Sequence, residues 1–139
     1  MVKRGRTSEV PRREAKVLLA KAVEFMAMAR LADSAEEHDA SMLMSVHAAI
    51  AANDAICVAL LGLRSSEPDH VRAVDLLESA AHLEEDVGTR VRQLRSLLEQ
   101  KTPIAYTARR ATASEARDGI RRALRFVEWA EQVVARARV

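Results

Sequence analysis

The sequence predicts an all-α protein, folded as an antiparallel up-down bundle of four long helices. Half of the residues are hydrophobic (49%), yet only 3% are aromatic, so small and branched aliphatic side chains supply the packing material. Four glycines and three prolines are too few for a turn-rich β protein. Apolar residues recur every three or four positions along most of the chain, which is the period of a helix. A chain of 139 residues is the size of one domain and buries roughly 70% of its unfolded surface without a metal or disulfide.

The N-terminal part divides into a tail and a first helix. Residues 1–10 are polar and basic, so we expect a disordered tail, and no apolar stretch follows that would make it a signal peptide. A single bundle domain covers residues 11–139. Its first helix runs from about 11 to 35, with Pro11 suited to the first turn. The inward positions of this helix are Leu18, Ala22, Phe25 and Ala29.

The second helix, from about residue 40 to 62, is apolar over most of its circumference. Such a helix lies deep in a bundle or at an oligomer interface. Gly62 is suited to end it. The apolar run over 48–61 contains Asn53 and Asp54 and is short for a bilayer, so we expect no membrane span.

The third helix begins around Ser66, which can cap it, with Pro68 in the first turn. A break near Gly88 divides it and makes five helices; one continuous kinked helix is the alternative. Pro103 ends this segment because a proline pushes the preceding residue out of the helical region. We expect residues 101–111 to form a loop.

The last helix starts at a capping box, in which Thr112 and Glu115 satisfy each other's backbone donors. Its apolar positions again follow a helical period. They are Ala116, Ile120, Ala123, Val127, Ala130 and Val134.

The chemistry-bearing residue types exclude several classes of site. Cys57 is the only cysteine, so an internal disulfide is impossible, and a reducing cytoplasm fits. It is expected to act as a small buried apolar residue. The four histidines form no metal-binding motif, and no glycine-rich phosphate loop is present. We therefore expect no metal and no cofactor.

Charge is unevenly distributed, although the net charge is only +2. Residues 1–30 hold eight Lys or Arg against three acids, 31–90 hold three against twelve, and 91–139 hold eleven against five. Basic ends and an acidic middle can pair helix to helix inside one bundle. Alternatively, they present a basic face to an anionic partner.

The basic residues of the C-terminal part are candidates for binding the phosphates of a nucleic acid. The candidates are Lys101, Arg109, Arg110, Arg117, Arg121 and Arg125. The last three succeed one another at i+4 spacing. Tyr106 and Trp129 are the only tyrosine and tryptophan, so platforms for base stacking are scarce. The alternative is a surface loop beside a solvated arginine face.

His47 and Asp54 lie seven residues apart in the second helix and therefore share one of its faces. A histidine and a carboxylate on an apolar face are costly to bury unless each finds a partner. Either they tie the bundle together or they belong to a site.

Three short segments together resemble one protein family. They are the stretch from His47 to Ala55, the pair Asp69-His70, and Leu97-Leu98 followed by Lys101 and Tyr106. In this order they are similar to HEPN-domain proteins, above all the small stand-alone bacterial ones, over about residues 12–137. The resemblance implies an all-helical fold. It also implies metal-independent ribonuclease activity, often that of a toxin, from an arginine and a histidine four to six residues apart. Two such sites usually meet across a homodimer.

The chain departs from that pattern at both positions, where Lys101 replaces the arginine and Tyr106 replaces the histidine. Lysine still holds phosphate as a point charge, but tyrosine, with a pKa of about 10, is a poor base. His47 is a candidate substitute for the lost histidine. We expect instead that His47, Asp54, His70 and Tyr106 form a hydrogen-bonded network in the core.

These observations predict a cytoplasmic homodimer that binds RNA, a nucleotide or a protein partner without catalysis. One alternative is a ribonuclease toxin with an atypical site at Lys101, Tyr106 and His47. A second alternative is a purely structural subunit of a larger complex.

Overall fold

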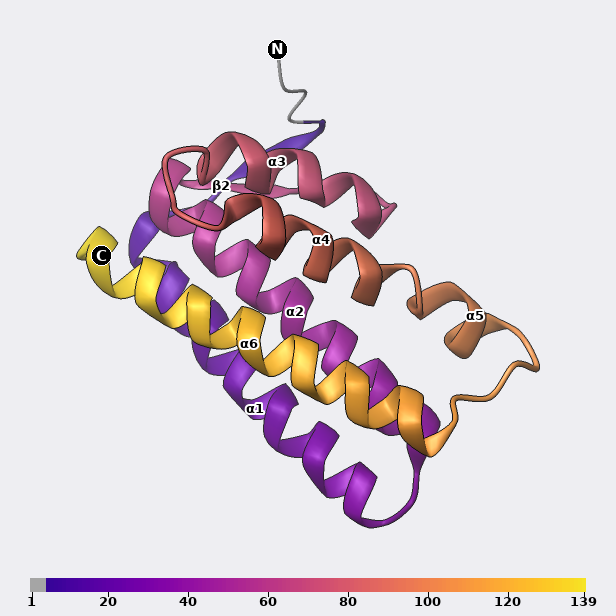
Figure 1. Cartoon of the computed structure of the whole chain (residues 1–139). Helices are drawn as coiled ribbons and strands as arrows, with labels where there is room; N and C mark the ends of the chain where they lie inside the picture. Colours follow the sequence, from indigo (N-terminus) through magenta and orange to yellow (C-terminus); the bar gives the residue numbers. More distant parts are fainter. Residues whose placement is uncertain (1–4) are drawn as a thin grey trace.

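Three long helices frame the bundle in this computed structural model, which describes residues 5–139 (Figure 1). They are α1 (Ala15–Ser34), α2 (His38–Leu61) and α6 (Ala113–Ala137). A short turn joins α1 to α2, which run antiparallel, and α6 packs along both (Figure 1). The all-α bundle predicted from the sequence is confirmed, with these helix bounds within a few residues of the expected ones.

Helix α2 is the centre of the molecule, and every residue from 51 to 59 is buried. α1, α3, α4, α5 and α6 all contact it, so its apolar surface is covered on all sides. By length and composition α2 also passes as a membrane span, but 72% of its most apolar window is buried inside the bundle. Gly62 ends the helix with a φ of 67°, the left-handed conformation expected of a glycine there.

Shorter elements complete the bundle. They are the 3-10 turns η1 (Arg12–Glu14) and η2 (His70–Arg72), and the helices α3 (Ala73–Ala80), α4 (Val87–Leu98) and α5 (Lys101–Tyr106). The predicted break near Gly88 is confirmed, since α3 ends at Ala80 and α4 begins at Val87. Asp86, with a φ of 63°, turns the chain between them.

Two boundary predictions are wrong. Residues 101–106 form helix α5 rather than a loop, because Pro103 lies in its first turn, where a missing N–H costs no hydrogen bond. Ser66 and Pro68 do not open the third helix. Asp69 instead caps the 3-10 turn η2, which leads directly into α3, and its Oδ1 accepts a 3.0 Å hydrogen bond from the backbone N–H of Val71.

The expected disordered tail over 1–10 is wrong for its described part, while residues 1–4 lie outside the described residues. β1 (Thr7–Glu9) pairs antiparallel with β2 (Leu63–Ser65), with Thr7 opposite Ser65. The Arg6 backbone N–H also donates to Glu67 Oε1 at 2.9 Å. These partners follow α2 in the chain, so the composition of the tail alone does not reveal them.

The start of α6 matches the sequence prediction. The Thr112 side chain accepts from the Glu115 N–H, and the Glu115 carboxylate accepts from the Thr112 N–H. The inward positions expected of α6 are buried except Ile120, which is partly buried. These contacts fix α6 against α2 and leave its opposite face to solvent.

Candidate functional site

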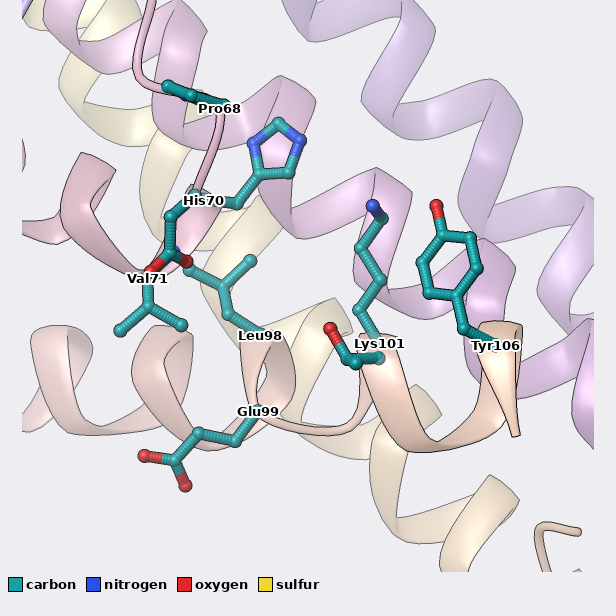
Figure 2. Close-up of a pocket in the computed structure, with 9 residues that line it drawn as sticks. Pro68, His70, Val71, Leu98, Glu99, Lys101 and Tyr106 are labelled. Atoms are coloured by element: carbon teal, nitrogen blue, oxygen red, sulfur yellow. The ribbon is translucent and has the colours of Figure 1, made fainter. Parts of the chain in front are cut away.

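An open hollow of about 640 Å³ lies between the segment that opens α3 and the α4–α5 junction (Figure 2). The side chains that matter in its wall are Pro68, His70, Val71, Leu98, Lys101 and Tyr106. The hollow therefore brings together three residues that the sequence singled out from two separate segments. Figure 2 shows the His70 ring, the Lys101 ammonium and the Tyr106 ring directed toward a common space, with Glu99 turned away.

Helix α5 positions Lys101 and Tyr106 side by side. The Lys101 Nζ lies 5.5 Å from the centroid of the Tyr106 ring, a cation–π contact. Tyr106 is 71% exposed. Lys101 forms no salt bridge with a carboxylate anywhere in residues 5–139. The hollow thus contains a lysine whose charge no acid neutralises.

Two half-buried histidines lie near this lysine. Burial lowers the pKa of His47, and the positive charge of Lys101 lowers it further. Burial also lowers the pKa of His70, with Lys101 and His47 adding to the effect. Both imidazoles are therefore neutral at pH 7, and each has a ring nitrogen able to accept a proton. A neighbouring anion would relieve the excess positive charge.

Asp54 forms an ion pair with Arg64 in a second hollow that also includes His70. Its carboxylate lies 3.3 Å from Arg64 Nε, on a narrow hollow that shares His70 and Leu98 with the larger one. Burial raises the pKa of Asp54 to about 6, although Arg64 opposes the shift. Asp54 is thus a nearly buried carboxylate with little access to water. Its charged partner is Arg64, so Asp54 does not form a catalytic pair with His47.

The predicted core network of His47, Asp54, His70 and Tyr106 is wrong. No hydrogen bond joins any two of these four side chains within residues 5–139, and Tyr106 is an exposed residue of the open hollow rather than part of the core. The physical reason is that helix α5 places Tyr106 at the open hollow beside Lys101 instead of in the core. Only the two histidines lie close enough for one to affect the pKa of the other.

A second concave surface lies between α4 and α6, with a volume of about 430 Å³. We call it the arginine groove. Its lining is Thr89, Arg92, Gln93, Asp118, Arg121, Arg122 and Arg125. Four guanidinium groups therefore face one carboxylate, and the groove has a formal charge of +3.

Contacts within the arginine groove leave most of that charge available. Asp118 accepts from Arg121 at 3.1 Å and from Arg122 at 2.9 Å, so one carboxylate serves two arginines. Arg92 bonds only the Thr89 hydroxyl, at 3.2 Å. Arg125 is exposed and makes no ion pair among the described residues. Such a surface favours a ligand with several negative charges.

The basic residues predicted to bind phosphate do not form one patch. Arg121 and Arg125 line the arginine groove, and Lys101 lies in the other hollow. Arg110 pairs with Asp39 at 2.9 Å, and Arg109 pairs with the capping residue of α6. These two arginines have structural partners and are poor candidates for a ligand. Arg117 is exposed one turn before Arg121 but does not line the groove.

Arg92 and Arg122 are the two groove arginines outside the predicted phosphate-binding set, and Arg92 is the one that comes from a different helix, α4. Its position on the outer side of α4 follows from the helical period, so its exposure was predictable. The sequence does not predict which helix α4 packs against. Only the contact between α4 and α6 brings Arg92 opposite Arg125.

The chain matches no known family model, no curated protein and no solved structure. The likeness to HEPN domains therefore rests on the three short sequence segments that carry it. Within residues 5–139 no group of three His, Cys, Asp or Glu side chains is placed to hold a metal ion.

Proposed function

We propose that this protein is a HEPN-like bundle that binds RNA, or a nucleotide, through phosphate groups in the arginine groove and does not cleave it. The observation that carries the proposal is the convergence of four arginines on one groove with a single shared carboxylate. Guanidinium groups match phosphate oxygens in charge and in planar hydrogen-bond geometry.

The spacing of the arginines suits a strand rather than a lone anion. Arg121 and Arg125 lie one turn apart on α6, about 6 Å along the helix axis, and Arg92 faces them from α4. Each therefore reaches a different phosphate of one strand. The groove lining includes no aromatic side chain, so the binding is expected to depend little on base sequence.

The test is the salt dependence of binding to a labelled single-stranded RNA, measured by fluorescence anisotropy. Three phosphate contacts on a single strand give a slope of log K against log salt of roughly −2. The double variant Arg121→Gln/Arg125→Gln is expected to bind more weakly, with a slope reduced by roughly 1.4.

A matched control removes the same charge elsewhere. Arg13→Gln/Arg30→Gln changes two exposed arginines outside the groove and is expected to keep the parent slope. No RNA binding at about 50 mM salt, or equal losses in the two double variants, would contradict the proposal.

A second candidate function is a metal-independent ribonuclease at the Lys101 hollow. The observation in its favour is a neutral His70 beside an unneutralised Lys101. In that role His70 would accept the proton of a ribose hydroxyl, and Lys101 would stabilise the charge that develops on the phosphate.

Cleavage is tested with RNA in the presence of a metal chelator and by growth after expression in a bacterium. The ribonuclease proposal predicts cleavage and growth arrest, both abolished by His70→Ala and weakened by His47→Ala or Tyr106→Phe. Intact RNA after incubation with the parent protein, together with normal growth, would refute it and leave binding as the remaining proposal.

A further inference from the structure

A smaller pocket opens beside the arginine groove, between the end of α4 and the first turns of α6. Its volume is about 160 Å³, and it shares Asp118 and Arg122 with the groove. We call it the polar pocket, after the half-buried side chains that line it: Ser96, Gln100, Glu115, Asp118 and Arg122. Its volume is below the range of pockets that enclose a drug-sized ligand. The polar pocket is therefore suited to one small part of a ligand whose remainder lies in the groove.

The polar pocket and the arginine groove have opposite formal charges. Glu115 and Asp118 face the single cation Arg122 in the pocket, which gives it a charge of −1, whereas the groove has +3. Phosphate groups are therefore favoured in the groove, and a group rich in N–H donors is favoured in the pocket. Because the two sites share residues, one molecule can fill both if it carries a phosphate close to such a group.

Arg122 is held in one orientation at the border between the two sites. Its Nε lies 2.9 Å from the Asp118 carboxylate, and its Nη1 donates to the Ser96 hydroxyl. The other terminal nitrogen, Nη2, remains available as a donor. The Gln100 side chain has no hydrogen-bond partner among residues 5–139, so its amide is free both to donate and to accept. The pocket thus offers a fixed guanidinium donor, carboxylate acceptors and a free amide.

Guanine matches this set of groups better than the other bases do. Its N1–H and N2 amino donors lie side by side, and its O6 and N7 atoms accept hydrogen bonds. The donors suit a carboxylate such as Asp118, and the acceptors suit a guanidinium such as that of Arg122. Adenine and cytosine have an amino group but no ring N–H, while uracil has a ring N–H but no amino group. The buried Met42 adds a thioether surface for the flat face of a ring.

We propose that the polar pocket binds a guanine base whose phosphate lies in the arginine groove. This site rests on the proposed function, because the groove arginines hold the phosphate. The groove alone binds phosphates of any sequence, and the pocket adds a preference for one base. Guanosine within an RNA strand and a free guanine nucleotide present the same chemistry, so the experiment compares the two sources.

The first arm compares RNA strands that differ in one base. A labelled uridine strand of about ten nucleotides is measured by fluorescence anisotropy beside the same strand with one central guanosine, inosine or adenosine. One guanosine should tighten binding at least about fivefold over uridine. Inosine lacks the N2 amino group and should fall between the two, and adenosine should resemble uridine. The ratio of the guanosine and uridine affinities should not change with salt, because base contacts release no counterions.

The second arm removes the free amide of the pocket. Gln100→Ala should reduce the preference for guanosine at least about threefold. Gln132→Ala is the matched control, because it changes an exposed glutamine of α6 that lines neither the pocket nor the groove, and it should keep the parent preference. A guanosine preference that Gln100→Ala leaves unchanged would place the base elsewhere and overturn the proposal.

The third arm uses calorimetric titration with guanosine diphosphate and adenosine diphosphate, without any strand. A guanine preference in strands alone assigns the pocket to RNA, and one seen also with the diphosphates extends it to free nucleotides. Strands that bind with equal affinity whatever their central base, together with equal binding of the diphosphates, would overturn the guanine site and leave the proposed function standing. If no strand binds but guanosine diphosphate binds more tightly than adenosine diphosphate, RNA binding fails and the guanine site stands. Absence of all binding would refute both.

Discussion

Replacing Asp54 by asparagine tests whether the ion pair between Asp54 and Arg64 stabilises the fold. Asp54 is only 8% exposed, whereas the Arg64 side chain is 55% exposed. Removing the carboxylate from water therefore costs free energy that a largely solvated guanidinium 3.3 Å away does not fully return. The raised pKa of Asp54, about 6 instead of 3.8, is the measure of that deficit.

The size and sign of the effect follow from proton linkage. A shift of about two pKa units corresponds to roughly 3 kcal/mol between the two protonation states. Because the folded state binds the Asp54 proton more tightly than the unfolded state does, the native protein loses stability as the pH rises from about 4 to about 6. Asparagine stays neutral at every pH. Asp54→Asn is therefore expected to raise the free energy of unfolding by up to about 3 kcal/mol at pH 7.5, and by almost nothing near pH 3.5.

Urea unfolding of both proteins across this pH range is the assay, with thermal melting as a second readout. For a chain of this size the gain at pH 7.5 corresponds to a rise in Tm of roughly 10 °C. Asp39→Asn is the matched control, because the pKa of Asp39 is shifted in the opposite direction and the variant is expected to lose stability at pH 7.5. The Ala111 backbone N–H and Arg110 lower the pKa of Asp39, so its stabilising contribution is present above its unfolded pKa and disappears in acid.

One result would refute this reasoning about burial. If Asp54→Asn lowers the free energy of unfolding at pH 7.5, and the loss grows with pH as it does for Asp39→Asn, then the Asp54–Arg64 pair is net stabilising. The pKa of Asp54 would then lie below 3.8 rather than near 6.

Three further predictions concern stability and accessibility. Thr112→Ala removes the side-chain half of the capping box of α6 and should lower the free energy of unfolding in urea by about 1 kcal/mol; unchanged stability would mean that the cap contributes nothing. Burial raises the pKa of the Cys57 thiol, so an aromatic disulfide reagent should label it only after denaturation, and rapid labelling of the native protein would contradict its burial. A side chain at Gly119 would meet Met42, with the first added carbon only 3.0 Å from its sulfur. Gly119→Leu should therefore cost about 1–3 kcal/mol of stability, measured by thermal melting, and a variant as stable as the parent would show that α2 and α6 have room to separate.

The long helices could be predicted because their signals are local. Apolar periodicity places α1, α2 and α6, Gly62 ends α2 in the left-handed conformation, and Thr112 begins α6 with its cap. The break between α3 and α4 was also predicted, near Gly88, although Gly88 itself lies in the first turn of α4 and Asp86 turns the chain. Each of these features depends on residues within one or two helical turns.

The elements that the sequence did not predict depend on contacts with residues far along the chain, or on a proline position that a helix tolerates. β1 exists because β2, more than fifty residues later, offers backbone partners. α5 forms although Pro103 is a helix breaker elsewhere, because a first turn tolerates it and Ile104 is buried against the bundle. Neither condition can be read from the local sequence.

The sequence identified several residues of the candidate site but did not predict how they are placed relative to one another. His70, Lys101 and Tyr106 do gather around one hollow, yet Tyr106 is exposed rather than part of the core. Asp54 was expected to bond to a neighbour from its own polar set and instead pairs with Arg64. Which helices pack together decides these partners, and that information lies outside any single segment.

The fold divides the unevenly distributed basic residues into two groups, those paired with acids of the middle segment and those that are not. Basic residues from the chain ends pair with acids of the middle segment in four ion pairs among the described residues: Arg6 with Glu67, Arg95 with Glu78, Arg110 with Asp39, and Arg136 with Glu84. The arginines of the groove have no acid from the described part of that segment within ion-pair distance and share only Asp118 on α6.

This division separates two kinds of arginine that the sequence alone treats alike. An arginine paired with a distant acid holds two elements together, so its loss is felt in stability and only weakly, because such exposed pairs contribute little. Arg125 of the groove makes no ion pair with any described residue, so its loss should leave the fold intact and, under the proposed function, reduce the binding of an anionic ligand. The contrast between Arg110 and Arg125 is therefore the most direct comparison of structural and ligand-directed charge that this bundle offers.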